Sequence, residues 1–113
     1  MAPGKFIGML FHSRDAMHIA HLQTTSFAEH KALNGYYDEI LDLTDKFSEV
    51  YFGRNKRVEI IIPESKNMES IAHLKEIQSM LDSERDNYSS ELQNIIDEML
   101  SLVNKTLYLL TLS

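Results

Sequence analysis

The chain has no cysteine, and this absence removes several kinds of chemistry at once. It excludes disulfide bonds, zinc sites built from thiolates and reactions that need a thiol nucleophile. A chain without cysteine is compatible with a reducing compartment, so we expect a cytoplasmic protein.

Long apolar runs are also missing. The N-terminal run Phe6-Ile-Gly-Met-Leu-Phe11 has only six residues and no small-residue cleavage site, so it does not have the form of a signal peptide. The C-terminal stretch from Leu100 to Leu112 contains several polar residues and falls short of the ~20 apolar residues that span a bilayer. We therefore expect a soluble protein with no membrane partner.

Positive charge is scarce. Eleven Lys and Arg residues face 17 Asp and Glu residues, which gives a formal charge of −6. The largest basic cluster is Arg54-Asn-Lys56-Arg57, which is too small to neutralise a run of phosphates. We expect no nucleic-acid partner.

What is present is the composition of one folded domain. Apolar residues make up 43% and charged residues 25% of the 113 residues, as in soluble globular proteins. A chain of this length can bury one core but not two, so residues 1–113 are predicted to form a single domain.

Apolar residues recur mainly at helical intervals, in four segments. The first is expected from about Lys5 to Gln23, after a turn at Pro3-Gly4, and the second from Phe27 to a stop at Gly53. The pattern Ser26-Phe-Ala-Glu29 is typical of a capping box at the start of the second helix. The third helix is expected from Ser65 or Asn67, with an apolar stripe of Met68, Ile71, Leu74, Ile77 and Leu81, and the fourth from about Tyr88 to Leu110.

The long break in this pattern covers residues 53–66 and contains Val58-Glu-Ile-Ile-Ile62 followed by Pro63. No second strand is evident to pair with this β-branched run, so we expect an extended crossover that covers one face of a helical bundle. The predicted fold class is therefore all-α, a four-helix bundle with one longer crossover between helices 2 and 3, which is the ferritin-like arrangement.

Familiar catalytic motifs are absent. The chain has no Glu-x-x-His motif of the di-iron carboxylate bundles, no His-Glu-x-x-His zinc motif, no glycine-rich phosphate loop and no nucleophile elbow. Any chemistry must therefore come from side chains brought together in another way.

Metal-capable side chains follow one side of the second predicted helix. His30 and Asn34 are four positions apart, as are Asp45 and Glu49, and Asp45 follows Asn34 by eleven positions, which is about three helical turns. Four side chains on one stripe form either part of a metal site or a solvated face of an amphipathic helix. The spacing alone leaves both readings open.

In this stretch the chain resembles the Dps-type miniferritins of the ferritin-like superfamily. The resemblance runs from about Met9 to Gly53 and from about Met68 to Leu110, and it places five residues where that family has its metal ligands: His21, His30, Asn34, Asp45 and Glu49. It implies a homo-oligomer, at least a dimer, whose metal site for iron or another divalent ion lies between two subunits. His21, His30 and Asn34 of one subunit would then face Asp45 and Glu49 of another.

Three departures from that family bear on the chemistry. Asn34 stands where the family has Asp, the connector between the two histidines is shorter and lacks a glycine, and Leu22 replaces an aromatic residue. A neutral carbonyl in place of a carboxylate lowers the affinity of a site for a divalent cation. The chain also resembles small uncharacterised proteins encoded by tailed phages.

Other histidines and tyrosines have simpler interpretations. His12, Asp15, His18 and His21 are spaced by threes and could form a second set, although such histidines usually bond to a neighbouring backbone group or carboxylate. His73 is expected in a surface or groove position. The tyrosines of the second helix are expected to pack with their hydroxyls reaching water.

Two functions follow from these residues. The first is a non-catalytic or degenerate relative of the miniferritins that acts through oligomerisation or by binding another protein. The alternative is a metal-binding protein that oxidises Fe(II) at an inter-subunit site made by His21, His30, Asp45 and Glu49.

Overall fold

Four α-helices and one short 3-10 turn make up the computed structural model, which describes residues 1–113 and contains no strand. The elements are α1 (Pro3–Gln23), α2 (Phe27–Arg54), α3 (Ser70–Glu84), η1 (Arg85–Asn87) and α4 (Ser90–Leu110). This confirms the all-α class and the four-helix bundle with its long link between helices 2 and 3. None of the helices is both long enough and apolar enough to cross a membrane.

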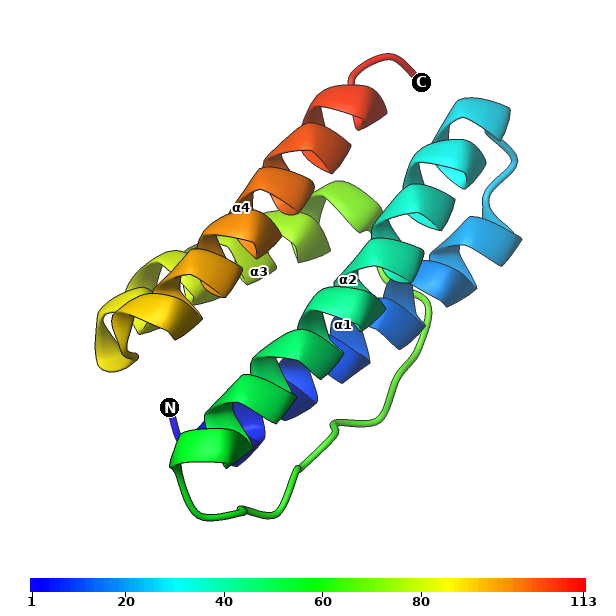
Figure 1. The fold of residues 1–113 in the computed structure, drawn as a ribbon. Helices are drawn as coiled ribbons and strands as arrows, with labels where there is room; N and C mark the ends of the chain where they lie inside the picture. The colour runs from blue at the N-terminus through cyan, green and yellow to red at the C-terminus, as the bar shows by residue number, and fades with distance from the viewer.

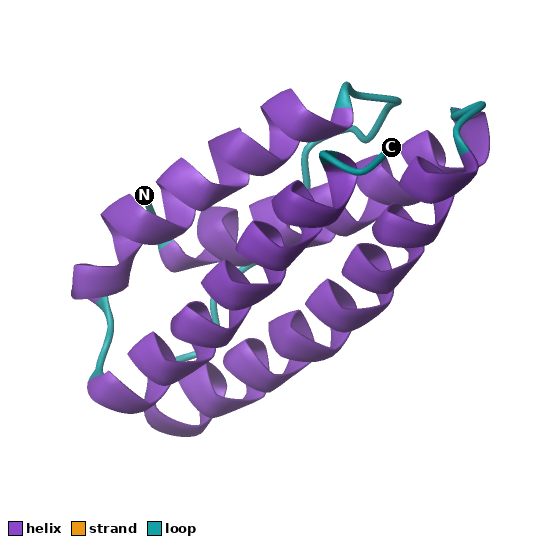
Figure 2. Ribbon diagram, turned by 90° about the horizontal axis from the view of Figure 1, so that it is seen from above, coloured by secondary structure: helices purple, strands orange, loops and turns teal.

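The helices pack side by side in an elongated body of 43 × 25 × 20 Å (Figure 1). α2 packs against both α1 and α4, and α3 closes the other side against α4 (Figure 2). Every helix contributes residues that are fully shielded from solvent, including Phe6, Leu33, Ile77 and Val103. The core therefore runs along the whole bundle and leaves the outer side of α2 to solvent.

Side-chain caps fix where two helices begin. The Ser26 hydroxyl accepts a hydrogen bond of 3.2 Å from the Glu29 amide, so α2 starts as the capping box predicts. The Glu69 carboxylate accepts from the amides of Ile71 and Ala72, at 3.2 and 2.6 Å. α3 therefore begins at Ser70, later than expected, because Glu69 satisfies the first free amides there.

Two helix boundaries expected at glycines, before α1 and at the end of α2, are wrong. Pro3 and Gly4 lie in the first turn of α1 and not in a turn before it, which fits the preference of proline for the first helical position. Gly53 does not stop α2, which continues to Arg54.

The crossover, residues 55–69, runs along α1 without forming helix or strand (Figure 1), as expected. It comes so close to α1 that a Cβ on Gly4 would overlap the carbonyl oxygen of Glu59, and one on Gly8 the carbonyl oxygen of Ile61. The Ile61 amide donates to the Gly4 carbonyl at 3.2 Å. The two glycines are therefore what lets the crossover backbone lie on the helix.

Four burial predictions are wrong. Leu74, Ile77 and Leu81 of the expected apolar stripe of α3 are fully buried, but Ile71 is 38% exposed while His73 is only 3% exposed. Phe27, whose helical spacing from Leu33 and Tyr36 predicts a place on the apolar face of α2, is 74% exposed at the first position of the helix. Tyr36 is completely buried, and its hydroxyl does not reach water. The buried face of α3 consists of Ser70, His73, Leu74, Ile77, Leu81 and Glu84.

Candidate functional site

Two of the predicted ligands meet at the connector between α1 and α2. His21 lies in the last turn of α1 and His30 in the first turn of α2. The Nδ1 atom of His21 donates to the backbone carbonyl of His30 at 2.6 Å, and Nδ1 of His30 donates to the carbonyl of His21 at 2.8 Å. Because a carbonyl oxygen only accepts, both Nδ1 atoms must carry a proton.

The two imidazoles belong to a continuous group of rings, the histidine cluster, made of His18, His21, His30 and Tyr37. The rings of His21 and His30 stack with centroids 3.7 Å apart and planes 18° apart. His18 stacks on Tyr37 at 4.1 Å and meets His21 edge-on at 5.9 Å. This packing holds the end of α1 against the beginning of α2.

The Nε2 atoms of His21 and His30 make no hydrogen bond. They are also not sealed inside the protein, because the buried side-chain atoms that lack a partner are Arg14 Nε and His73 Nδ1. A histidine that binds a metal commonly donates its other ring nitrogen to a carbonyl, which is the state of both rings here. Each Nε2 atom is therefore available as a ligand.

The stacking nevertheless prevents both rings from holding the same ion. A metal bound by imidazole lies about 2.1 Å from the nitrogen, in the plane of the ring. In two nearly parallel rings 3.7 Å apart, the lone pairs point along separate planes and do not converge. Each ring can supply one ligand to an ion of its own, and the remaining ligands must come from other residues.

Asn34 is one turn along α2, on the exposed side. Its Oδ1 atom accepts a hydrogen bond of 2.7 Å from the hydroxyl of Tyr37. Asn34 is thereby attached to the histidine cluster, although its carbonyl already has a partner.

Asp45 and Glu49 are both exposed and lie farther along the same helix. Fifteen residues at 1.5 Å each put Asp45 about 22 Å from His30 along the axis. No group of three or more metal-capable side chains forms within the chain. One chain alone therefore brings His21 and His30 together but not the two acids, and the shared site between subunits stays a prediction.

The second predicted set does not form either. The Nδ1 atom of His12 lies 3.3 Å from the Ser65 hydroxyl in the crossover, and Asp15 pairs with Arg14 at 3.0 Å. His18 and His21 contact each other only edge-on within the histidine cluster. Hydrogen bonding to the backbone, as His21 shows, was the simpler interpretation and is confirmed for that residue.

A buried polar chain links α1, α2 and α3, and sequence reasoning missed it. The Ser13 hydroxyl lies 2.6 Å from the hydroxyl of Tyr36 and 2.8 Å from Nε2 of His73. The rings of His12 and His73 meet edge-on at 5.7 Å. The serine and the histidine are shielded from solvent, so this pair is a structural connection and not an accessible nucleophile.

Burial controls the ionisation of His73 and Tyr36 in this buried polar group. Loss of solvent, together with the nearby His12, lowers the pKa of His73 to about 4. Burial also raises the pKa of Tyr36 far above its usual value, against the opposing effect of the hydrogen bond with Ser13. Both side chains are therefore neutral near pH 7. The Nδ1 atom of His73 has no partner.

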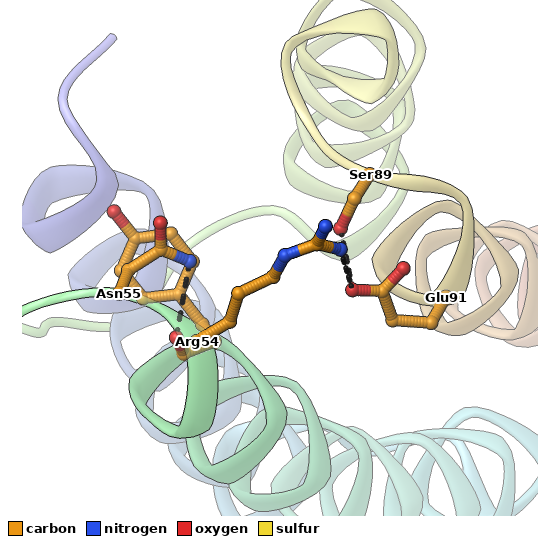
Figure 3. A network of polar contacts seen from close by, with 5 residues as sticks. Arg54, Asn55, Ser89 and Glu91 are labelled. Carbon is orange, nitrogen blue, oxygen red and sulfur yellow. Dashed lines mark hydrogen bonds and ion pairs between the residues drawn. The ribbon is translucent and has the colours of Figure 1, made fainter.

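A second polar cluster closes the far end of the bundle, where α2 ends beside the beginning of α4 (Figure 3). Arg54 donates to Glu91 at 3.0 Å, and the Ser89 hydroxyl donates to the same carboxylate at 2.8 Å. The hydrogen bond from Ser89, with that from Arg54, holds the pKa of Glu91 below its usual range. Because the Glu91 carboxylate already occupies the amino end of α4, this cluster joins α2 to α4 and does not form a free anion site.

Comparisons with known proteins place the chain among proteins without an assigned activity. The model of the family of unknown function DUF5856 matches residues 21–110, which include all five predicted ligands. A protein of Enterobacteria phage T4, described as an uncharacterized 14.6 kDa protein in the mobD-ri intergenic region, is 30% identical over 112 residues. That match covers 96% of this chain and 87% of the phage protein. No solved structure matches the chain.

Proposed function

We infer that this chain, which belongs to the family of unknown function DUF5856, is a self-associating helical bundle that binds a divalent metal ion between two copies. Association would use the outer side of α2. The observation that supports this proposal best is the fixed protonation of His21 and His30. Their Nδ1 atoms are both committed to carbonyl groups, so in the neutral rings both Nε2 atoms offer a lone pair to solvent.

An antiparallel pair of α2 helices completes the set of ligands. If two copies cross at a two-fold axis midway between residues 39 and 40, His30 of one copy lies opposite Glu49 of the other. In the same register Asn34 lies opposite Asp45. The axis repeats both pairings, so one dimer would contain two equivalent sites. Each site would have imidazole from one copy and two carboxylates from the other.

Charge explains why association would depend on the metal. The outer side of α2 presents the exposed carboxylates of Asp38, Asp45 and Glu49. Two such surfaces repel each other, and a divalent cation between them removes part of that repulsion. Leu41, in the middle of this surface, is half-buried yet is not among the apolar residues that pack against the core. It would provide apolar contact close to the axis.

The donor set favours binding over catalysis. One imidazole and two carboxylates suit Fe(II), Mn(II) or Zn(II). The position that would add a further negative charge is Asn34, whose neutral carbonyl is held by Tyr37. We therefore propose metal-dependent association as the main function. Oxidation of Fe(II) in air is the second candidate, because imidazole with carboxylates is a donor set that suits iron.

Sedimentation equilibrium with and without Mn(II) tests this proposal. The mass of the wild-type protein should rise on adding Mn(II), relative to its mass in EDTA, because the metal adds an association step through α2. Glu49→Gln removes one proposed ligand at an exposed position with no hydrogen bond within the chain, so it should prevent the Mn(II)-dependent shift without affecting thermal stability. Asp45→Asn should have the same effect.

Glu39→Gln is the matched control. Glu39 is an exposed glutamate of the same helix, but it lies in the groove between α2 and α4 and not on the proposed interface. It should behave like the wild type. A wild-type protein whose mass does not rise with Mn(II) and that binds no Mn(II), or an equal loss in Glu39→Gln and Glu49→Gln, would contradict the proposal. In the first case the paired histidines serve only to hold α1 against α2.

A further inference from the structure

The crossover leaves most of its backbone without partners in the chain. Within residues 56–68, the amide of Ile61 is the one that donates a hydrogen bond to another part of the protein. All other amides of this stretch that carry a hydrogen have no acceptor in the chain. An extended segment with a free row of donors and acceptors is a template for pairing with another strand.

The alternating direction of backbone groups along the crossover shows which of its edges is free. The carbonyl groups of Glu59 and Ile61 point at α1, because they are the atoms that a Cβ on Gly4 or Gly8 would meet. The Ile61 amide also points at α1. In an extended chain the backbone groups of successive residues face opposite edges. The amides and carbonyls of Val58, Ile60 and Ile62 therefore face away from α1.

Proline does not interrupt this free edge. Pro63 has no amide hydrogen, but its odd number places it with Glu59 and Ile61 on the edge that α1 covers. The side chains around the edge are apolar and accessible: Val58 is 38% exposed, and Ile61 and Ile62 are each 50% exposed. A free edge bordered by exposed β-branched residues favours the addition of a strand.

We propose that this edge pairs with the same edge of a second copy, as a two-stranded antiparallel ribbon centred on Ile60. In this register Ile60 lies opposite its own copy and Val58 lies opposite Ile62, so each outward donor meets an outward acceptor. Lys56 then lies opposite Glu64, and the two-fold axis makes this pair twice. Neither Lys56 nor Glu64 has an ion-pair partner within its own chain, and both are exposed.

The charges of the residues that face each other favour this register. Cross-strand pairs of opposite charge stabilise a ribbon, and like charges destabilise it. A shift by two residues in either direction would lose the Lys56–Glu64 pair and the apolar pair of Val58 with Ile62. This contact shares no residue with the outer side of α2, so it does not depend on the metal-binding proposal.

Charge reversal gives a test that leaves the fold intact. All measurements use sedimentation equilibrium of the full chain in EDTA, which removes metal-dependent association. The wild-type chain should self-associate. Lys56→Glu and Glu64→Lys should each weaken self-association by about tenfold or more, because each replaces two attractive pairs with two repulsive ones. An equimolar mixture of the two variants should associate as well as the wild type, since the carboxylate introduced in one variant then faces the ammonium group introduced in the other.

Proline substitution tests the hydrogen bonds separately. Val58→Pro removes an outward amide and should weaken self-association, whereas Glu59→Pro removes an amide on the edge that α1 covers and should leave it unchanged. Circular dichroism of each variant confirms that the helices are retained. A wild-type chain that stays monomeric in EDTA at concentrations up to about 1 mM overturns the proposal. So does a mixture of the charge variants that associates no better than either variant alone.

Discussion

Replacing His73 should make the stability of this protein less sensitive to mild acid. His73 is 3% exposed, its Nε2 atom lies 2.8 Å from the Ser13 hydroxyl, and its Nδ1 atom has no partner. Burial, with the nearby His12, lowers its pKa from 6.5 to about 4. Between these two values the unfolded chain holds a proton on this residue that the folded chain does not. Stability therefore falls as the pH drops below 6.5 and levels off below about 4.

The size of the effect follows from the two pKa values. One pKa unit corresponds to about 1.36 kcal/mol, so the full loss from this residue is about 3 kcal/mol. Between pH 7 and pH 5, where most carboxylates stay ionised, the expected loss is about 2 kcal/mol. Against a typical unfolding free energy of about 5–15 kcal/mol, this loss is large enough to measure.

Urea unfolding at pH 7 and pH 5 measures this difference. His73→Gln cannot gain the proton, so its free energy of unfolding should fall by about 2 kcal/mol less than that of the wild type over this range. Tyr36→Phe is the control, since it removes another member of the same buried polar chain but leaves His73 in place, and it should keep the wild-type dependence. The comparison uses the change with pH, so a general loss of stability in His73→Gln does not affect it. Equal pH dependence in the wild type and His73→Gln would refute the reasoning.

Further substitutions test the packing and the caps. Gly8→Ala should destabilise the protein by about 1–3 kcal/mol in urea unfolding, because the new methyl group would overlap the Ile61 carbonyl. Gly35→Ala has open space around the new Cβ and should instead stabilise α2 by up to about 1 kcal/mol; a loss of the same size at both glycines would contradict this account. Tyr36→Phe should cost about 1–2 kcal/mol, since it removes the buried hydroxyl bonded to Ser13, and an unchanged melting temperature would show that this bond contributes nothing. Ser26→Ala should cost about 1 kcal/mol by removing the cap of α2, whereas Ser26→Thr should retain most of the stability.

Helical periodicity was sufficient to predict the number of helices and their connections. The repeat of apolar residues at three and four positions defines each helix, and the interruption after Gly53 requires a long crossover. The cap at Ser26 was predictable because its bond is local, joining residues three positions apart. Pro3 and Gly53 were misread because both residues are tolerated in the terminal turns of a helix.

Long-range partners account for the errors in burial. A histidine in α3 has the sequence pattern of a groove residue, and its burial depends on a serine 60 positions earlier that bonds to it. Tyr36 is buried for the same reason, through a bond to a residue 23 positions away. Gly4 and Gly8 fit a helix pattern, but their function is set by the crossover that packs over them.

The candidate site was predictable only in part, because its two halves lie far apart on one helix. Helix geometry places His30, Asn34, Asp45 and Glu49 on one side of α2, and the structure keeps that helix continuous. The reciprocal bonds of His21 and His30 depend on the shape of a short connector and could not be read from spacing. The resemblance to the miniferritins stays a prediction, as does the sharing of ligands between subunits.

Subunit mixing followed by native mass spectrometry tests that sharing most directly. His30→Ala lacks the proposed imidazole and Glu49→Gln lacks the proposed carboxylate, so neither variant alone should form a dimer that holds Mn(II). A mixed dimer of the two contains one intact site, with His30 from one chain and Glu49 from the other, and should carry one Mn(II) ion. Mixed chains that carry no Mn(II), while the wild type binds Mn(II), would show that the site is not shared between two copies.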